Sequence, residues 1–173
     1  WSMWCYLQSG SKEFISLLTY CLGDDKVIIR PLEAPYFTAL YLCFGTSPLG
    51  YHIVNATCEI AGAWFLCLAL ARLTGNMALC LVASSLFLLN PIHDATHYWI
   101  TASSVTVSLS LFLCSFWLCL KGVQESKPIW IIASVLIFAA SVFNYESFAP
   151  LSLLIIITVF FEKAFRSGLV VAL

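Results

Sequence analysis

Two histidines, an aspartate and an asparagine lie in a short gap between two apolar runs, within the stretch SSLFLLNPIHDATHYWITASS at 84–104. His93 and His97 are four residues apart, a spacing that on a helix could present two imidazoles to a metal ion. Pro91 breaks the preceding helix, no glutamate follows His93, and no third ligand is evident. We therefore predict no metal site and interpret the histidines as hydrogen-bonding partners of a phosphate or a sugar hydroxyl. The alternative is that they are interfacial residues that cap the next helix.

A second polar series lies at the start of the apolar run at 51–73. His52, Asn55 and Glu59 are separated by three and four residues, so on a helix they form one stripe about two turns long. Glu59 would lie about 10 Å below the outer end, given the rise of 1.5 Å per residue. A carboxylate within a membrane is costly and usually faces a bundle interior or a wet cavity, so we expect this stripe to face inward. A neutral Glu59 that is hydrogen-bonded to a neighbouring helix is the alternative.

Two further segments carry residues that could take part in chemistry. GDDKVIIRPL contains Asp24 and Asp25, which are candidates for a catalytic base or, alternatively, solvated loop residues and helix caps. Arg30 follows them and suits a planar, two-pronged contact with a phosphate. VFNYESFAPL places Tyr145 and Glu146 at a corner between two apolar runs. They either reach the same cavity or begin the next helix.

The composition predicts the elements that position these residues. Of the 173 residues, 61% are hydrophobic and 10% are charged, whereas a soluble domain has roughly 45–50% apolar and about 25% charged residues. A helix that crosses a membrane needs about 20 apolar residues. We predict an all-α, polytopic transmembrane helix bundle with spans at 51–73, 77–89, 99–120, 129–143 and 148–161. The second, fourth and fifth spans are short, which implies local thinning of the bilayer or helix ends inside a protein-lined cavity.

The first fifty residues differ from the rest. Charges recur every few residues, and the apolar pieces at 14–22 and 36–44 are too short to span a membrane. We predict that residues 1–50 form an extracytoplasmic or lumenal loop with short interfacial helices. Residues 51–173 would form the bundle of about five helices. Because the chain begins with Trp1 and not with Met, we expect it to be a fragment of a larger membrane domain.

The distribution of basic residues predicts which side of the membrane each loop faces. Lysines and arginines fall at alternate breaks between the spans, at Arg72, Lys121, Lys127, Lys163 and Arg166. The loops at 90–98 and 144–147 contain neither residue. By the positive-inside rule the basic set faces the cytoplasm. The polar groups then face the extracytoplasmic or lumenal side of a bacterial inner membrane or of an endoplasmic-reticulum type membrane.

Charge and cysteine usage exclude other classes of function. The formal net charge is -1 and the eight basic residues form no stripe, which argues against a nucleic-acid partner. The eight cysteines include no C-x-x-C pair and fall mostly in apolar runs. We interpret them as packing residues and not as metal ligands or disulfide partners.

The order of the motifs resembles a family of membrane enzymes. RPLEAPYFTALYLCFGTSPLGYHIVN, then a long apolar span, then NPIHDATHYWI and finally NYESFAPL is similar to the multispanning C-type glycosyltransferases. The nearest branch contains the protein O-mannosyltransferases and the tetratricopeptide-containing transmembrane mannosyltransferases. The resemblance covers about residues 30–150. It implies transfer of a sugar from a polyprenyl- or dolichyl-phosphate-linked donor to an unspecified acceptor on the outer or lumenal face.

The resemblance also implies roles for particular residues. The donor phosphate and sugar would be bound by Arg30, His52, Asn55, His93, His97 and Glu146. The cavity would be lined by Glu59, Asp94, Trp99 and Tyr145. No cofactor is clearly implied, and a divalent cation is left open.

The sequence departs from the family pattern in ways that matter for catalysis. Family members often have a second histidine where this chain has Glu59, and a histidine where it has Asn90. Their catalytic acid follows a first membrane helix, and residues 1–50 contain no apolar run long enough to form one. We expect this acid upstream of Trp1, with Asp24 or Asp25 as the alternative. The competing hypothesis is a non-enzymatic multispanning membrane protein, such as a transporter fragment or an assembly subunit.

Overall fold

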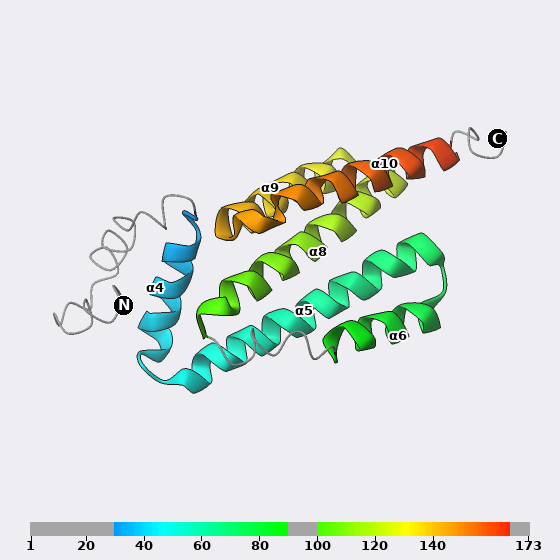
Figure 1. Cartoon of the computed structure of the whole chain (residues 1–173). Helices are drawn as coiled ribbons and strands as arrows, with labels where there is room; N and C mark the ends of the chain where they lie inside the picture. The colour runs from blue at the N-terminus through cyan, green and yellow to red at the C-terminus, as the bar shows by residue number, and fades with distance from the viewer. Residues whose placement is uncertain (1–29, 90–99, 167–173) are drawn as a thin grey trace.

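The computed structural model describes residues 30–89 and 100–166, and every regular element in these two ranges is a helix (Figure 1). The all-α class is therefore confirmed for the described part of the chain. The α-helices are α4 (Glu33–Phe44), α5 (Pro48–Thr74), α6 (Met77–Leu88), α8 (Ser103–Glu125), α9 (Pro128–Asn144) and α10 (Ser152–Arg166). Two short 3-10 helices, η2 (Ile100–Ala102) and η3 (Glu146–Leu151), precede α8 and α10.

Local sequence explains where these helices begin and end. Proline occupies the first position of both α5 and α9, where its missing N–H group has no intrahelical partner to lose. Gly75 ends α5 with a φ of 67°, a left-handed conformation that glycine adopts without strain. The side-chain oxygen of Asn76 then accepts a hydrogen bond of 3.2 Å from the Leu79 N–H group and caps α6. The tight connection between α5 and α6 follows directly from this Gly-Asn pair.

The five predicted spans correspond to α5, α6, α8, α9 and α10, with shifted ends for two of them. The third helix was expected to end at residue 120, but α8 continues through a polar turn to Glu125 and stops where Ser126 becomes left-handed, with φ 55°. The fifth was expected to begin at 148. Pro150 instead lies in η3, and α10 begins at Ser152. Of the predicted interfacial helices, 36–44 lies within α4, and 14–22 lies outside the described residues.

Among the helices that the structure describes, two have the length and apolar composition needed to cross a membrane. They are α5, with 27 residues, and α8, with 23. The apolar helices α6 and α9 are shorter, with 12 and 17 residues. Because the core helix of a soluble protein can meet the same two criteria, α5 and α8 give limited support for a membrane protein.

The helices are arranged around α8 (Figure 1). Its two main neighbours are α9 and α5, which pack along it, while α6 returns along α5 and α10 contacts α8 and η3. A small apolar core of Ala69, Phe116 and Leu120 joins α5 to α8. The chain thus runs back and forth, so that the starts of α5, α8 and α10 and the end of α9 lie at one end of the bundle.

Hydroxyl groups form the contact between α8 and α9. Ser115 and Ser134 each donate to the carbonyl oxygen of the other, at 2.9 and 2.8 Å. Two turns away on both helices, the Ser141 hydroxyl donates to the Ser108 carbonyl at 2.7 Å. Each pair is seven residues from the next on its helix, so both lie on one face. Small residues with hydroxyl groups allow such close approach, which is typical of helix contacts in membranes.

The same contact continues at Gly122, near the other end of α8. A Cβ atom at this position would lie 2.6 Å from Ile131 Cγ1 and 3.0 Å from the Ile131 backbone nitrogen. A backbone atom cannot move aside as a flexible side chain can. Glycine is therefore required for the start of α9 to lie this close to α8.

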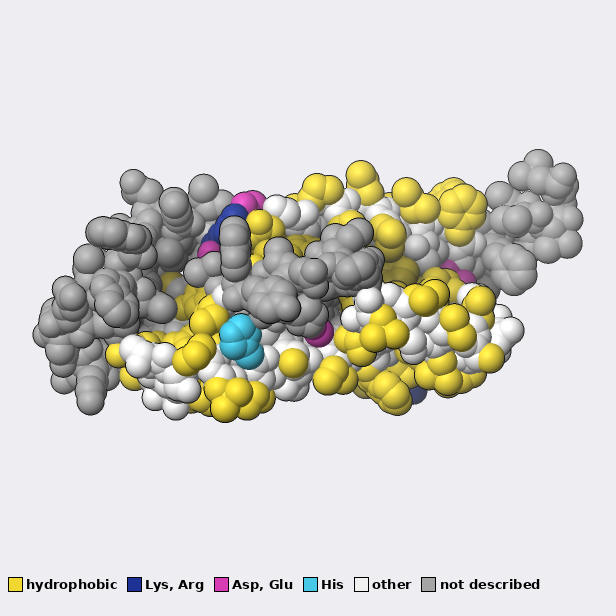
Figure 2. Space-filling view, turned by 60° about the horizontal axis from the view of Figure 1, so that its bottom comes forward, with side chains coloured by type: hydrophobic (Ala, Val, Ile, Leu, Met, Phe, Trp, Pro, Cys, Tyr) yellow, Lys and Arg dark blue, Asp and Glu magenta, His cyan; other side chains and the backbone are white. Residues whose placement is uncertain are grey.

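The outer surface is dominated by large apolar side chains. Figure 2 shows a face where hydrophobic atoms cover most of the described surface and charged groups are few. On α5, α6, α9 and α10 many of these side chains are more than half exposed, among them Trp64, Leu86, Leu136 and Phe160. Hydroxyl groups inside and large apolar groups outside give the bundle a surface suited to an apolar environment.

Candidate functional site

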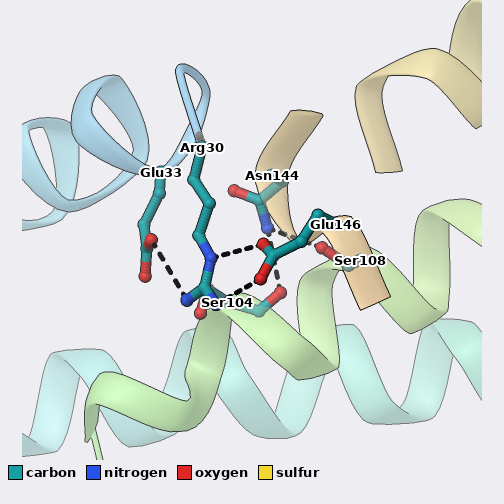
Figure 3. A network of polar contacts seen from close by, with 6 residues as sticks. All are labelled: Arg30, Glu33, Ser104, Ser108, Asn144 and Glu146. Atoms are coloured by element: carbon teal, nitrogen blue, oxygen red, sulfur yellow. Dashed lines mark hydrogen bonds and ion pairs between the residues drawn. The ribbon is translucent and has the colours of Figure 1, made fainter. Parts of the chain in front are cut away.

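Arg30 and Glu146, which are 116 residues apart in the sequence, form a two-pronged ion pair (Figure 3). Arg30 Nε donates to Glu146 Oε2 at 2.5 Å, and Nη2 donates to Oε1 at 2.8 Å. Glu33 lies on the other side, with its Oε2 3.6 Å from Arg30 Nη1. The guanidinium carbon also lies 4.1 Å from the centre of the Tyr145 ring. Of the residues predicted to form a site, Arg30, Tyr145 and Glu146 are therefore brought together.

Hydrogen bonds to α8 and α9 hold this group in place. The Leu32 N–H group donates to the Phe143 carbonyl at 3.3 Å, which joins the start of α4 to the end of α9. The Asn144 side-chain amide donates to the Ser104 carbonyl at 2.9 Å and to the Ser108 hydroxyl at 2.8 Å (Figure 3). Both serines and Asn144 are buried. The loop that carries Tyr145 and Glu146 is thus anchored on α8.

The charges of this group are unbalanced. One guanidinium faces two carboxylates, so the three side chains carry a net charge of -1 when all are ionised. The hydrogen bonds from Arg30 hold the pKa of Glu146 below its ordinary value of 4.5, and the same contact raises the pKa of Arg30. The Glu146 carboxylate therefore accepts the hydrogen bonds of the Arg30 guanidinium that a planar oxyanion would accept. A second oxyanion, such as a phosphate, could contact the full guanidinium fork only by displacing Glu146.

The lowered pKa of Glu146 predicts how stability depends on pH. A carboxyl whose pKa is lower in the folded state stabilises the fold fully above its unfolded pKa, near 4.5, and loses this contribution as pH falls through the folded pKa. We expect the stability advantage of the wild type over Glu146→Gln to be constant between pH 5 and 7 and to shrink below pH 4.5. Unfolding curves of both proteins in mixed micelles at these pH values would measure it. A constant difference down to pH 3 would contradict the ion pair.

Two of the three residues in the predicted stripe on α5 lie as expected. Asn55 and Glu59 are buried, with exposed fractions of 3% and 8%, so the inward orientation predicted for them is confirmed. His52 is half-buried. Glu59 lines a pocket between α5, α6 and α8, whereas the Arg30 group lies among α4, η3 and α8. The stripe and the Arg30 group thus contact different sets of helices.

The remaining predicted site residues fall before residue 30 or between residues 89 and 100. Outside the described ranges lie Asp24, Asp25, His93, Asp94, His97 and Trp99. Their proposed roles in catalysis, donor binding and lining of the cavity stay predictions.

Four residues of the site were not predicted from the sequence: Glu33, Ser104, Ser108 and Asn144. Glu33 could have been found, because it lies one helical turn after Arg30 at the i, i+3 spacing of a salt bridge. Asn144 lies directly beside Tyr145, but its partners are 36 and 40 residues away. Nothing local in the sequence indicates these long-range bonds.

Within residues 30–89 and 100–166, no three His, Cys, Asp or Glu side chains lie close enough together to hold a metal ion. The cysteines that the structure describes form no disulfide with one another, and three of them are buried. The site among these residues can supply a cation, two carboxylates and an aromatic face, which suits binding of a polar group by hydrogen bonds and charge.

Comparisons with protein-family models, with curated proteins and with solved structures found no match. A functional proposal for this chain therefore depends on the geometry of the site and on the order of its motifs.

Proposed function

We propose that the bundle is embedded in a membrane and that α5, α6, α8, α9 and α10 are all part of it. The large apolar side chains exposed on α5, α6, α9 and α10 would then contact lipid instead of water. The basic residues Arg72, Lys121 and Lys127 belong to the end of the bundle where α5 and α8 stop. Arg30 belongs to the opposite end. This distribution supports the predicted sidedness, with the Arg30 end extracytoplasmic or lumenal.

Within this membrane protein, the proposed activity is transfer of a sugar from a polyprenyl- or dolichyl-phosphate-linked donor to an acceptor at the Arg30 end. The observation that carries this proposal is the two-pronged contact between Arg30 and Glu146, which brings together the two most distant parts of the family-like motif pattern. Arg30 is the only arginine or lysine that the structure describes at this end. Among the described residues at this end, Arg30 is therefore the side chain that can form an ion pair with a lipid phosphate.

The mechanism follows from the charge that develops during transfer. When the acceptor displaces the lipid phosphate at the anomeric carbon, negative charge grows on the phosphate oxygens. Arg30 would stabilise that charge with the same fork of N–H groups that now contacts Glu146. Glu146 must then leave the guanidinium, and Tyr145 keeps the guanidinium in place through its ring face. The proton of the acceptor hydroxyl would go to the carboxylate expected upstream of Trp1 or, alternatively, to Asp24 or Asp25, which lie outside the described residues.

The ion pair also fits a second function, that of a non-enzymatic membrane component. In that case Arg30 and Glu146 only brace α4 against the loop after α9, and no ligand replaces the carboxylate. The two functions differ in whether Arg30 is ever released from Glu146.

Donor consumption by the intact protein tests the proposed activity. The protein, in native membranes, would be incubated with radiolabelled dolichyl-phosphate mannose and with polyprenyl-phosphate sugars, and the label recovered in water-soluble or protein products would be counted. We expect time-dependent transfer from at least one of these donors above membranes that lack the protein. Absence of transfer from every polyprenyl-phosphate sugar tested would contradict the proposal.

A further inference from the structure

A lysine at the end of the bundle opposite Arg30 lies between two tryptophan rings. The Lys121 ammonium nitrogen lies 3.7 Å from the centre of the Trp130 ring, which belongs to α9. It lies 5.2 Å from the centre of the Trp117 ring, one turn earlier on α8. The face of an indole ring attracts a cation, so the two rings hold the ammonium in a defined position. The side chain is only half-buried, which leaves it accessible from outside the bundle.

The carboxylate one turn after Lys121 on α8 is bound by two other cations. Glu125 Oε1 lies 3.0 Å from Arg72 Nη2, and Glu125 Oε2 lies 3.6 Å from Lys127 Nζ. None of the ion pairs in the described part of the chain includes Lys121. Among these residues, ring faces and not a carboxylate therefore contact the Lys121 ammonium.

The described side chains at this end carry an excess of positive charge. They comprise three cations and two carboxylates, a net charge of +1, contributed by Arg72, Lys121, Lys127, Glu125 and Glu162. Residues 163–173 add two further basic residues to the sequence, Lys163 and Arg166, and contain no acid. Charge complementarity thus favours an anionic partner at this end of the bundle.

The apolar surface beside Lys121 favours a lipid as the source of that anion. In the first three turns of α9, on either side of Trp130, the side chains of Ile129, Ile132 and Leu136 are each more than half exposed. Tryptophan rings near the ends of membrane helices typically lie at the level of the lipid headgroups. A phosphate on Lys121 would lie at that level, and its acyl chains could extend along the exposed side chains of α9.

We propose that Lys121 binds the phosphate of an anionic phospholipid of the phosphatidylglycerol class in the leaflet on the cytoplasmic side. A zwitterionic lipid such as phosphatidylcholine carries its own cation beside the phosphate, so it gains less from the lysine. This inference rests on the proposed position of the bundle in a membrane. It does not depend on sugar transfer or on the Arg30 site.

Native mass spectrometry of the full chain in detergent micelles, titrated with dioleoyl-phosphatidylglycerol or with dioleoyl-phosphatidylcholine, tests the proposal. We expect the wild type to bind phosphatidylglycerol more tightly. Lys121→Gln should reduce this preference about fivefold, which corresponds to the roughly 1 kcal/mol that one basic residue contributes near an anionic membrane surface. Lys121→Arg keeps both the charge and the ability to stack on the rings, so its preference should stay within about twofold of the wild type.

Lys127→Gln is the matched control. It makes the same substitution at the same end of the bundle, but Lys127 is 62% exposed and is paired with Glu125, so the preference should change less than about twofold. An equal loss in Lys121→Gln and Lys127→Gln would indicate attraction by net charge alone and overturn the proposed site. An unchanged preference in Lys121→Gln, or displacement of the lipid by excess inorganic phosphate, would also overturn it.

Flotation with phosphatidylcholine vesicles separates failure of this inference from failure of the membrane proposal. A chain that inserts into these vesicles but binds both lipids equally would overturn the lysine site alone. A chain that does not float with them would contradict the position of the bundle in a membrane, and the lysine site with it.

Discussion

Replacing Arg30 by alanine is expected to lower sugar transfer at least about 100-fold while the protein still inserts into membranes. Loss of one group that stabilises developing charge typically costs a factor of about 100–1000 in rate. Arg30 has no obvious substitute, since the described residues at this end of the bundle include no other lysine or arginine. Transfer of label from the lipid-phosphate donor would be measured in membranes that contain equal amounts of each variant.

Arg72→Ala is the matched control for this experiment. Arg72 is also an arginine bound by side-chain oxygens, with Gln124 Oε1 at 3.2 Å and Glu125 Oε1 at 3.0 Å. It belongs to the opposite end of the bundle, so its removal should leave transfer within about twofold of the wild type. A similar loss of transfer in both variants would mean that the effect is one of folding and not of donor binding.

An exchange of the two charges separates donor binding from bracing. In the double variant Arg30→Glu with Glu146→Arg, the ion pair is kept but the guanidinium is attached to η3 instead of the segment that leads into α4. If Arg30 contacts the donor, stability should recover relative to Arg30→Glu alone while transfer stays lost. Recovery of both would support the non-enzymatic brace for Arg30 and contradict its role in donor binding.

Helix positions could be predicted from the sequence because local signals determine them. The breaks between spans coincide with Gly75-Asn76 and with Pro128, and these residues act through the backbone of their own turn. Errors arose where a polar segment could continue a helix. The polar residues from Lys121 onward predict the end of the third span, yet α8 continues to Glu125. Its last polar side chains, Gln124 and Glu125, bond to Arg72 of α5.

The contacts that assemble the site could not be predicted in the same way. Arg30 and Glu146 were both singled out, each as a binder of the donor, but their direct pairing joins residues 116 positions apart. Likewise the inward orientation of Asn55 and Glu59 followed from helical spacing, whereas the partners of Asn144 on α8 did not. Spacing along one helix determines which residues share a face. It does not determine which other helix that face meets.

The serine contact between α8 and α9 leads to the largest expected effect on stability. Ser115 is fully buried, and its hydroxyl oxygen lies 3.1 Å from that of Ser134, which is 3% exposed. Leucine at 115 would have to fit between two helices that approach closely enough for each serine to reach the other's carbonyl oxygen. We expect Ser115→Leu to lower the free energy of unfolding by about 3 kcal/mol, from overpacking of about 1–3 kcal/mol and the loss of the hydroxyl bonds.

Two variants show whether this loss comes from the helix contact. Ser115→Ala removes the hydroxyl without adding volume and should cost about 0.6 kcal/mol, the average for hydrogen bonds between membrane helices. Ser85→Leu makes the same change of side chain as Ser115→Leu on the exposed surface of α6 and should change stability by less than about 0.5 kcal/mol. Unfolding of the three variants by SDS in mixed micelles gives these differences. If Ser115→Leu were as stable as Ser85→Leu, α8 and α9 could not pack through this serine face. The anchoring of Asn144 and of the Arg30 group on α8 would then also be wrong.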